Sequence, residues 1–151
     1  MRRFSLPLAF IALAALAVGP VSADSLYPTE RLTLDPVGDA SGSGAVVNIH
    51  PNGPNVFARE LYSLTGAGAE QSYQIHLRIW ASNLTCEGTP TLDLSTAMVE
   101  TNVQGNGQAE FVLRPSDVPE FLRNSRFSIN WIAEQRGVTH YATHCTIVAL
   151  D

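Results

Sequence analysis

The chain has 151 residues, 45% of them hydrophobic and 15% charged, and a formal net charge of −5 at pH 7. This length and composition predict one globular domain with a modest core, and they exclude a largely disordered chain. Its nine basic residues are all arginines and are outnumbered by 14 acidic residues. The basic surface that phosphate contacts require is therefore missing, which excludes a nucleic-acid-binding role.

Residues 1–23 have the pattern of an export signal. Two arginines precede an apolar run at 6–18, and small residues at 21–23 fit a signal peptidase site. The run is too short to form a stable membrane anchor. We therefore expect cleavage before Asp24 and a secreted or periplasmic product. Loss of the two leader arginines leaves seven against 14 acidic residues, a net charge of −7.

The remaining chain is expected to form one β domain over 45–151, preceded by a segment at 24–44. That segment contains an edge strand, which we expect to join the domain, and a Gly/Ser linker at 38–44. Strands are predicted at 31–37, 45–50, 56–64, 73–80, 97–103, 108–113, 126–134 and 138–150.

Three local patterns refine this layout. The sequence 51–55 has dense turn chemistry, and Gln104-Gly105-Asn106-Gly107 predicts a hairpin between the strands on either side. Residues 115–124 form the one helical candidate, with Phe121 and Leu122 facing the core. Together the elements predict an all-β fold, an antiparallel Ig-like or Greek-key β-sandwich of 7–8 strands with one short helix.

The only two cysteines are Cys86 and Cys145. Two cysteines in a small exported domain favour one structural disulfide. Closing a loop of about 60 residues should stabilise the domain by about 4 kcal/mol in the chain-entropy model.

The strand at 73–80 carries the candidate binding site. Its odd positions are apolar, so its even positions form a stripe on the other face: Gln74, His76, Arg78 and Trp80. Such a stripe is suited to binding a protein or a glycan, with Trp80 as the stacking anchor and Arg78 as a cation in an acidic chain. The alternative is that this face is the solvated side of the sheet, with Trp80 covering its rim.

The sequence predicts no catalytic residues, cofactor or metal site. His140 and His144 are four residues apart, about 13 Å along a strand, and His50 precedes a turn, so chelation from one face is not expected. No Gly-x-Ser-x-Gly nucleophile elbow is present. The remaining candidate acids and bases are carboxylates that we expect on solvent-facing positions: Glu60, Glu87, Asp93, Glu100 and Glu110.

The strand beginning Tyr73-Gln74-Ile75-His76, the later loop cysteine Cys86 and the final strand at 143–148 together resemble the copper/zinc superoxide dismutase family. The resemblance implies a sandwich in which a long loop is tied by a disulfide to the last strand. The family's His-x-His copper pair falls on Gln74 and His76, so one ligand is replaced, and the zinc ligands and the later copper histidine have no counterpart. It therefore implies a related sandwich without the catalytic metals.

Two functions remain open. The first is a non-catalytic secreted or periplasmic module with a binding or structural role at the cell envelope, acting on an unidentified protein or glycan. The second is a copper/zinc-binding redox protein of superoxide dismutase-like fold in which His76 is a metal ligand.

Overall fold

The structure is a computed structural model, which describes residues 29–49, 58–117, 119–122 and 125–150. The predicted export signal, its cleavage site and His50 lie outside these ranges. Among the described residues, no helix is long and apolar enough to cross a membrane.

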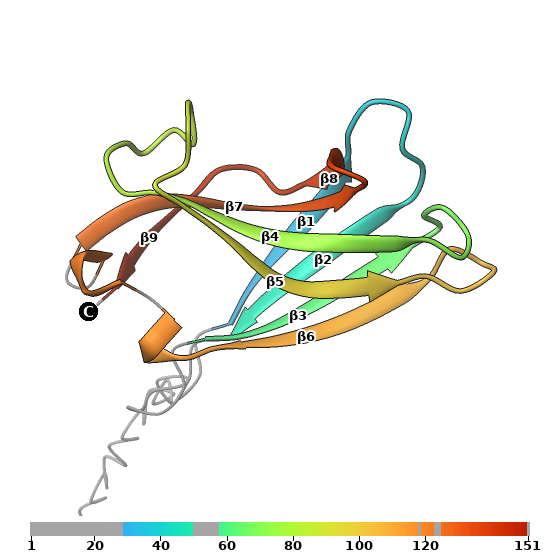
Figure 1. Cartoon of the computed structure of the whole chain (residues 1–151), viewed down its shortest axis with the longest axis horizontal. Helices are drawn as coiled ribbons and strands as arrows, with labels where there is room; N and C mark the ends of the chain where they lie inside the picture. Colours follow the sequence, from blue (N-terminus) through green and yellow to red (C-terminus); the bar gives the residue numbers. More distant parts are fainter. Residues whose placement is uncertain (1–28, 50–57, 118, 123–124, 151) are drawn as a thin grey trace, which may run out of the picture.

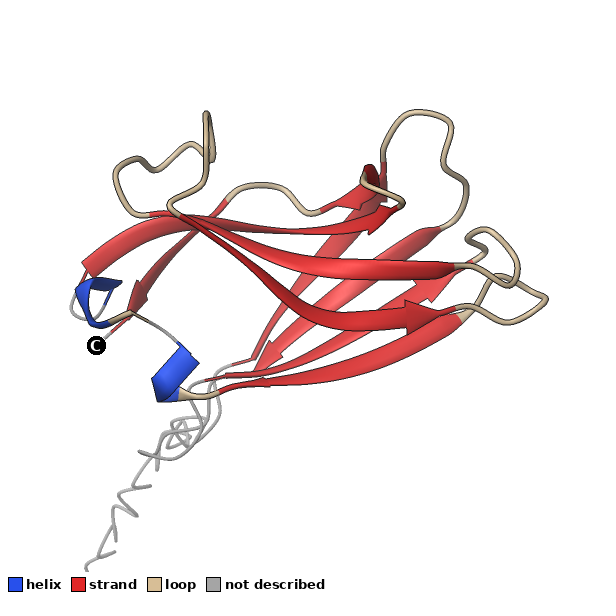
Figure 2. Cartoon of the chain, in the orientation of Figure 1, coloured by secondary structure: helices blue, strands red, loops and turns tan. Residues whose placement is uncertain are grey.

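The chain is all-β, as Figure 2 shows, and its strands are antiparallel. The strands are β1 (Thr29–Pro36), β2 (Ser43–Ile49), β3 (Ala58–Thr65), β4 (Ser72–Trp80), β5 (Leu92–Glu100), β6 (Gly107–Leu113), β7 (Ser125–Gln135), β8 (Val138–Ala142) and β9 (Thr146–Leu150). They form one sheet in the order β5-β4-β7-β8-β1-β2-β3-β6, with β9 paired to β7. The sheet curls into a nearly closed barrel (Figure 1).

The core follows the predicted alternation along the strands. In β4 the side chains of Tyr73, Ile75, Leu77 and Ile79 are buried, and the intervening Gln74, His76 and Arg78 are half-buried on the outer face. The inward side chains of β7 are Phe127, Ile129, Trp131 and Ala133, all of them buried. The expected inward face of β4 is confirmed and β7 shows the same alternation, because period-2 burial is a local property of an extended chain.

The expected helix at 115–124 is wrong. Two short 3-10 turns occupy this stretch, η1 (Pro115–Asp117) and η2 (Glu120–Leu122). Pro119 lacks the amide hydrogen that a continuous α-helix would need at this position. Leu122 is completely buried as predicted, but Phe121 is 59% exposed.

The expected hairpin between β5 and β6 is also wrong. The turn itself forms: Gly105 has a φ of 75°, and the Asn102 amide donates to the Asn106 carbonyl at 2.9 Å. However, β5 pairs with β4 and β6 pairs with β3 along its whole length. A turn sequence specifies a local reversal, whereas longer-range pairing decides which strand lies beside which.

Candidate functional site

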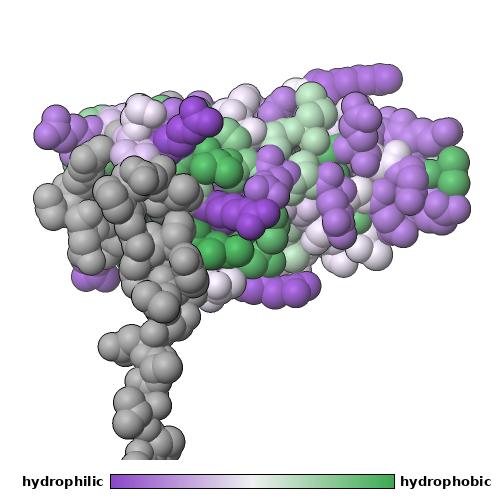
Figure 3. All heavy atoms as spheres, turned by 90° about the horizontal axis from the view of Figure 1, so that it is seen from below, coloured by the Kyte–Doolittle hydropathy of each residue, from purple (hydrophilic) through white to green (hydrophobic). Residues whose placement is uncertain are grey.

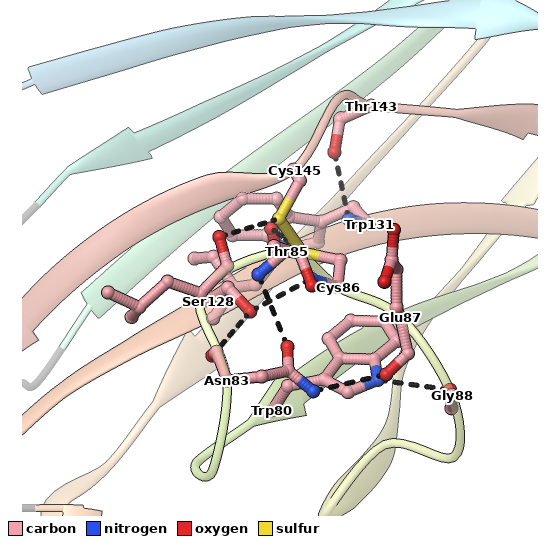
Figure 4. The surroundings of a disulfide bond; sticks show 12 residues. Trp80, Asn83, Thr85, Cys86, Glu87, Gly88, Ser128, Trp131, Thr143 and Cys145 are labelled. Carbon is pink, nitrogen blue, oxygen red and sulfur yellow. Dashed lines mark hydrogen bonds between the residues drawn. A yellow bond between two sulfur atoms is a disulfide. The ribbon is translucent and has the colours of Figure 1, made fainter.

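The predicted disulfide is present. Cys86 and Cys145 are bonded with a Cα–Cα distance of 5.7 Å and are 59 residues apart in sequence. The bond ties the 81–91 loop, between β4 and β5, to the segment between β8 and β9 (Figure 4). Ser128 on β7 reinforces it: its hydroxyl accepts from the Cys86 amide at 3.2 Å and donates to the Asn83 carbonyl at 3.1 Å. The loop is therefore fixed against the outer face of the sheet.

Trp80, the expected stacking anchor, lies beneath this loop. Its side chain is only 4% exposed, and its indole Nε1 donates to the Gly88 carbonyl at 3.1 Å (Figure 4). Trp80 thus packs between the sheet and the 81–91 loop. This position agrees with the alternative in which the indole covers the rim of the sheet.

The other three residues of the stripe lie together on the outer face of β4. Arg78 donates to both neighbouring strands, through Nε to Asp93 at 3.0 Å on β5 and through Nη2 to Glu134 at 2.9 Å on β7. His76 lies between the same two carboxylates, with Nδ1 2.8 Å from Asp93 and Nε2 3.8 Å from Glu134. Gln74 donates to the Ala97 carbonyl at 2.9 Å.

Each of these three side chains is therefore already hydrogen-bonded within the protein. The Arg78 guanidinium, expected to be a cation available to an acidic ligand, is neutralised by two carboxylates that accompany it on the surface. A ligand would have to replace hydrogen bonds that already exist, which yields little net free energy. The stripe therefore works as a clamp across β5, β4 and β7.

The histidines are dispersed over the described part of the molecule. His140 contacts the Tyr73 ring edge-on, with centroids 5.8 Å apart, and the exposed His144 lies 3.9 Å from Asp35. Within the described ranges, no group of three or more His, Cys, Asp or Glu side chains is arranged to hold a metal ion.

Glu60 is a carboxylate for which the predicted solvent-facing position is wrong. It was expected at a solvent-facing position, but it points into the barrel and is only 1% exposed. Its Oε2 is hydrogen-bonded to the Tyr62 hydroxyl and accepts from Trp131 Nε1 at 3.1 Å. The Tyr62 hydroxyl also lies 2.8 Å from Thr96 Oγ1. The alternation along the strand could have predicted this burial, because Glu60 lies two residues from both Ala58 and Tyr62, which are buried on the same face of β3.

The burial of Glu60 favours its neutral form. Desolvation raises the pKa of this carboxyl, while the hydrogen bonds from Tyr62 and Trp131 act in the opposite direction. Desolvation and the nearby carboxyl raise the pKa of Tyr62 as well, so its hydroxyl stays protonated. Asn48 is the cross-strand partner of Glu60, and its buried Oδ1 has no hydrogen-bond donor among the described residues.

A second outer surface was not anticipated from the sequence. Across β2, β3 and β6, a shallow groove is lined by the outward side chains of Val47, Leu61, Ser63, Gln108 and Glu110. Val47 lies opposite Leu61, and Ser63 lies opposite Gln108. On this side, Figure 3 shows apolar side chains between hydrophilic ones. We call this surface the β2–β3–β6 groove.

The groove differs from the β4 stripe in the state of its polar groups. No described residue hydrogen-bonds the side chains of Ser63 or Gln108, and Val47 and Leu61 are half-buried. At one margin Arg59 donates to both carboxylate oxygens of Glu110 at 2.8 Å. The groove thus combines apolar surface with polar groups that a ligand can still bind.

Comparison of the chain with protein-family models, with curated proteins and with solved structures finds no significant match.

Proposed function

We propose that this protein is a non-catalytic, extracytoplasmic binding module whose partner-binding surface is the β2–β3–β6 groove. The observation that carries the proposal is the combination of half-buried Val47 and Leu61 with the unengaged side chains of Ser63 and Gln108. Apolar area at the centre and polar groups around it are the composition of a protein-binding patch. The disulfide and the β4 stripe supply a rigid support for it.

The partner is a protein rather than a glycan. The apolar part of the groove is made by the aliphatic residues Val47 and Leu61, and the aromatic anchor expected for stacking, Trp80, is buried under the 81–91 loop. Aliphatic surface is best matched by the apolar side chains of another polypeptide.

We also propose that the barrel is a Greek-key sandwich related to superoxide dismutase but lacking its metals. Two features support this relationship. The strand order places β1-β2-β3-β6 in one half and β5-β4-β7-β8 in the other, so the chain crosses between halves after β3, after β5 and after β6. In addition, the Cys86–Cys145 bond ties the loop after β4 to the C-terminal strand region.

An extracytoplasmic location is supported by the disulfide and by the export-signal pattern at residues 1–23. Disulfides persist in oxidising compartments, where this bond would hold the 81–91 loop in place.

The binding role is tested by site-specific photocrosslinking in the native host. A benzophenone amino acid is placed at Ser63 or Gln108 in the groove, and at Val138, a 60% exposed residue of β8, as the matched control. We expect a discrete protein adduct from both groove positions and none from Val138. Equal labelling from all three positions would remove the groove from the proposal.

Metal analysis tests the non-catalytic part of the proposal. Protein isolated from the export compartment without chelators should contain copper and zinc far below one equivalent. Near-stoichiometric copper or zinc would overturn the proposal in favour of the redox alternative at His76.

A further inference from the structure

We propose that the seam between β5 and β6 accepts an extended segment of a partner protein as an added β-strand, in which apolar residues alternate with basic ones. This inference rests on the proposed binding role and specifies the form of the partner. It concerns the two strands at which the curled sheet ends, because among the described strands β5 is bonded only to β4 and β6 only to β3.

The seam is closed at one end and open at the other. At the closed end, the 101–106 turn joins the strands so tightly that a Cβ on Gly107 would lie 2.4 Å from the Glu100 carbonyl oxygen. From there the strands separate toward Leu92 at the start of β5 and Leu113 at the end of β6 (Figure 1). Within the described residues, no hydrogen-bonded ladder joins β5 to β6.

Apolar side chains along both edges are incompletely covered. They point inward and pack against the core, yet each is only half-buried: Leu92, Leu94, Ala97, Ala109 and Phe111. In register, Leu94 lies opposite the fully packed Leu77, so it occupies a core position on β5. An open seam explains why such core positions remain partly exposed to solvent, at a cost in hydrophobic stabilisation.

An extended chain is the ligand that satisfies both features of the seam. The facing edges of β5 and β6 carry main-chain N–H and C=O groups that no described strand pairs with, and an added strand would bond to them. Because side chains of a strand alternate between faces, every second residue of the added segment would point inward, toward Leu94 and Phe111. Those residues are expected to be apolar.

The outward positions of the added strand are expected to be basic. The neighbouring outward side chains include Asp93 and Glu100 on β5 and Glu110 on β6. Asp93 and Glu110 already have arginine partners, whereas Glu100 has no ion pair within the described part of the chain. A second copy of this chain fits poorly, because its own β5 and β6 strands contain acidic residues and no basic one.

The test uses a nine-residue synthetic peptide of alternating valine and lysine, added to the ¹⁵N-labelled mature protein. We expect slower amide exchange toward Leu92 on β5 and toward Leu113 on β6, where the seam is open and the edges can gain hydrogen bonds. The control peptide has the same sequence with every second amide N-methylated, which removes the hydrogen bonds along one edge. Equal binding of both peptides, or no binding of the unmodified one, would overturn the inference.

Two substitutions locate the site. Met98 is 49% exposed on β5, so Met98→Lys should leave the fold intact, and its added positive charge should weaken peptide binding about threefold. Met98→Gln is the matched neutral control and should bind as the unaltered protein does. Glu100→Gln removes the unpaired carboxylate and should weaken binding by a similar factor.

The outcomes separate this inference from the proposed function. Peptide-induced changes confined to the β2–β3–β6 groove would contradict strand addition and leave the binding role intact. Protection of β5 and β6 together with unspecific photocrosslinking at Ser63 would instead support the seam and contradict the groove.

Discussion

The two outer faces of this barrel have similar patterns of alternating polar residues, but they differ in whether those polar side chains are hydrogen-bonded within the protein. On the face formed by β5, β4 and β7, His76, Arg78, Asp93 and Glu134 are bonded to one another. On the face formed by β2, β3 and β6, Ser63 and Gln108 have no hydrogen-bond partner among the described residues. Alternating polar residues on a strand therefore predict which face of the strand points outward. Whether those polar side chains stabilise the fold or stay free to bind a ligand depends on the residues opposite them on the neighbouring strands.

The largest expected change in stability comes from breaking the disulfide that holds the 81–91 loop over Trp80. The double variant Cys86→Ser, Cys145→Ser should lose about 4 kcal/mol of unfolding free energy, because the unfolded chain regains the freedom of a loop of 59 residues. Urea unfolding followed by tryptophan fluorescence measures this loss, since Trp80 lies beneath the loop. A loss below about 1 kcal/mol would contradict this prediction and would mean that the crosslink restricts the unfolded chain only slightly.

The second prediction concerns the interior between the two faces. Because burial raises the folded-state pKa of Glu60, its contribution to stability is fully present below the pKa of the unfolded chain and is lost as pH rises through the folded-state pKa. Within that window the unfolding free energy should fall by about 1.4 kcal/mol per pH unit. Glu60→Gln should abolish this slope, because the amide stays neutral.

Thermal unfolding at closely spaced pH values from 4 upward measures the slope for both proteins. Glu110→Gln is the matched control, since the ion pair with Arg59 lowers the pKa of the exposed Glu110 and its removal should leave the downward slope in place. Parallel stability profiles for the unaltered protein and Glu60→Gln would show that Glu60 is ionised in the folded state.

The smallest expected losses of stability directly test the difference between the two outer faces. Arg78→Ala should lose about 1–2 kcal/mol, because it leaves Asp93 and the partly buried Glu134 without their shared cation. Gln108→Ala, at an exposed position of the groove, should change stability by less than about 0.5 kcal/mol. Chemical denaturation of the two variants in parallel makes the comparison, and equal losses would erase the distinction.

Features that depend on local geometry could be read from the sequence. The buried and exposed faces of β4 and β7 follow from alternation, and the disulfide follows from the only two cysteines of a chain that has the pattern of an export signal. Residues 104–107 also predicted a real turn. In each case the relevant forces act within one strand, one turn or one covalent bond.

Features that depend on which strands become neighbours could not be read in this way. The pairing of β6 with β3 instead of β5 is a long-range property, and it created both the groove and the seam. The burial of Trp80 depends on the path of the 81–91 loop, and the clamp around Arg78 depends on carboxylates from two other strands. The burial of Glu60 differs from these features, because the alternation along β3 alone was enough to predict it.

The position of Cys145 has a consequence for strand β9. In the described residues, β9 is bonded only to β7, so it can fray from its C-terminal end without disturbing another strand. Cys145 immediately precedes β9 and is covalently held to the 81–91 loop. Unpairing of β9 from β7 therefore stops at this residue, because the crosslink keeps Cys145 against the 81–91 loop whether or not β9 is paired.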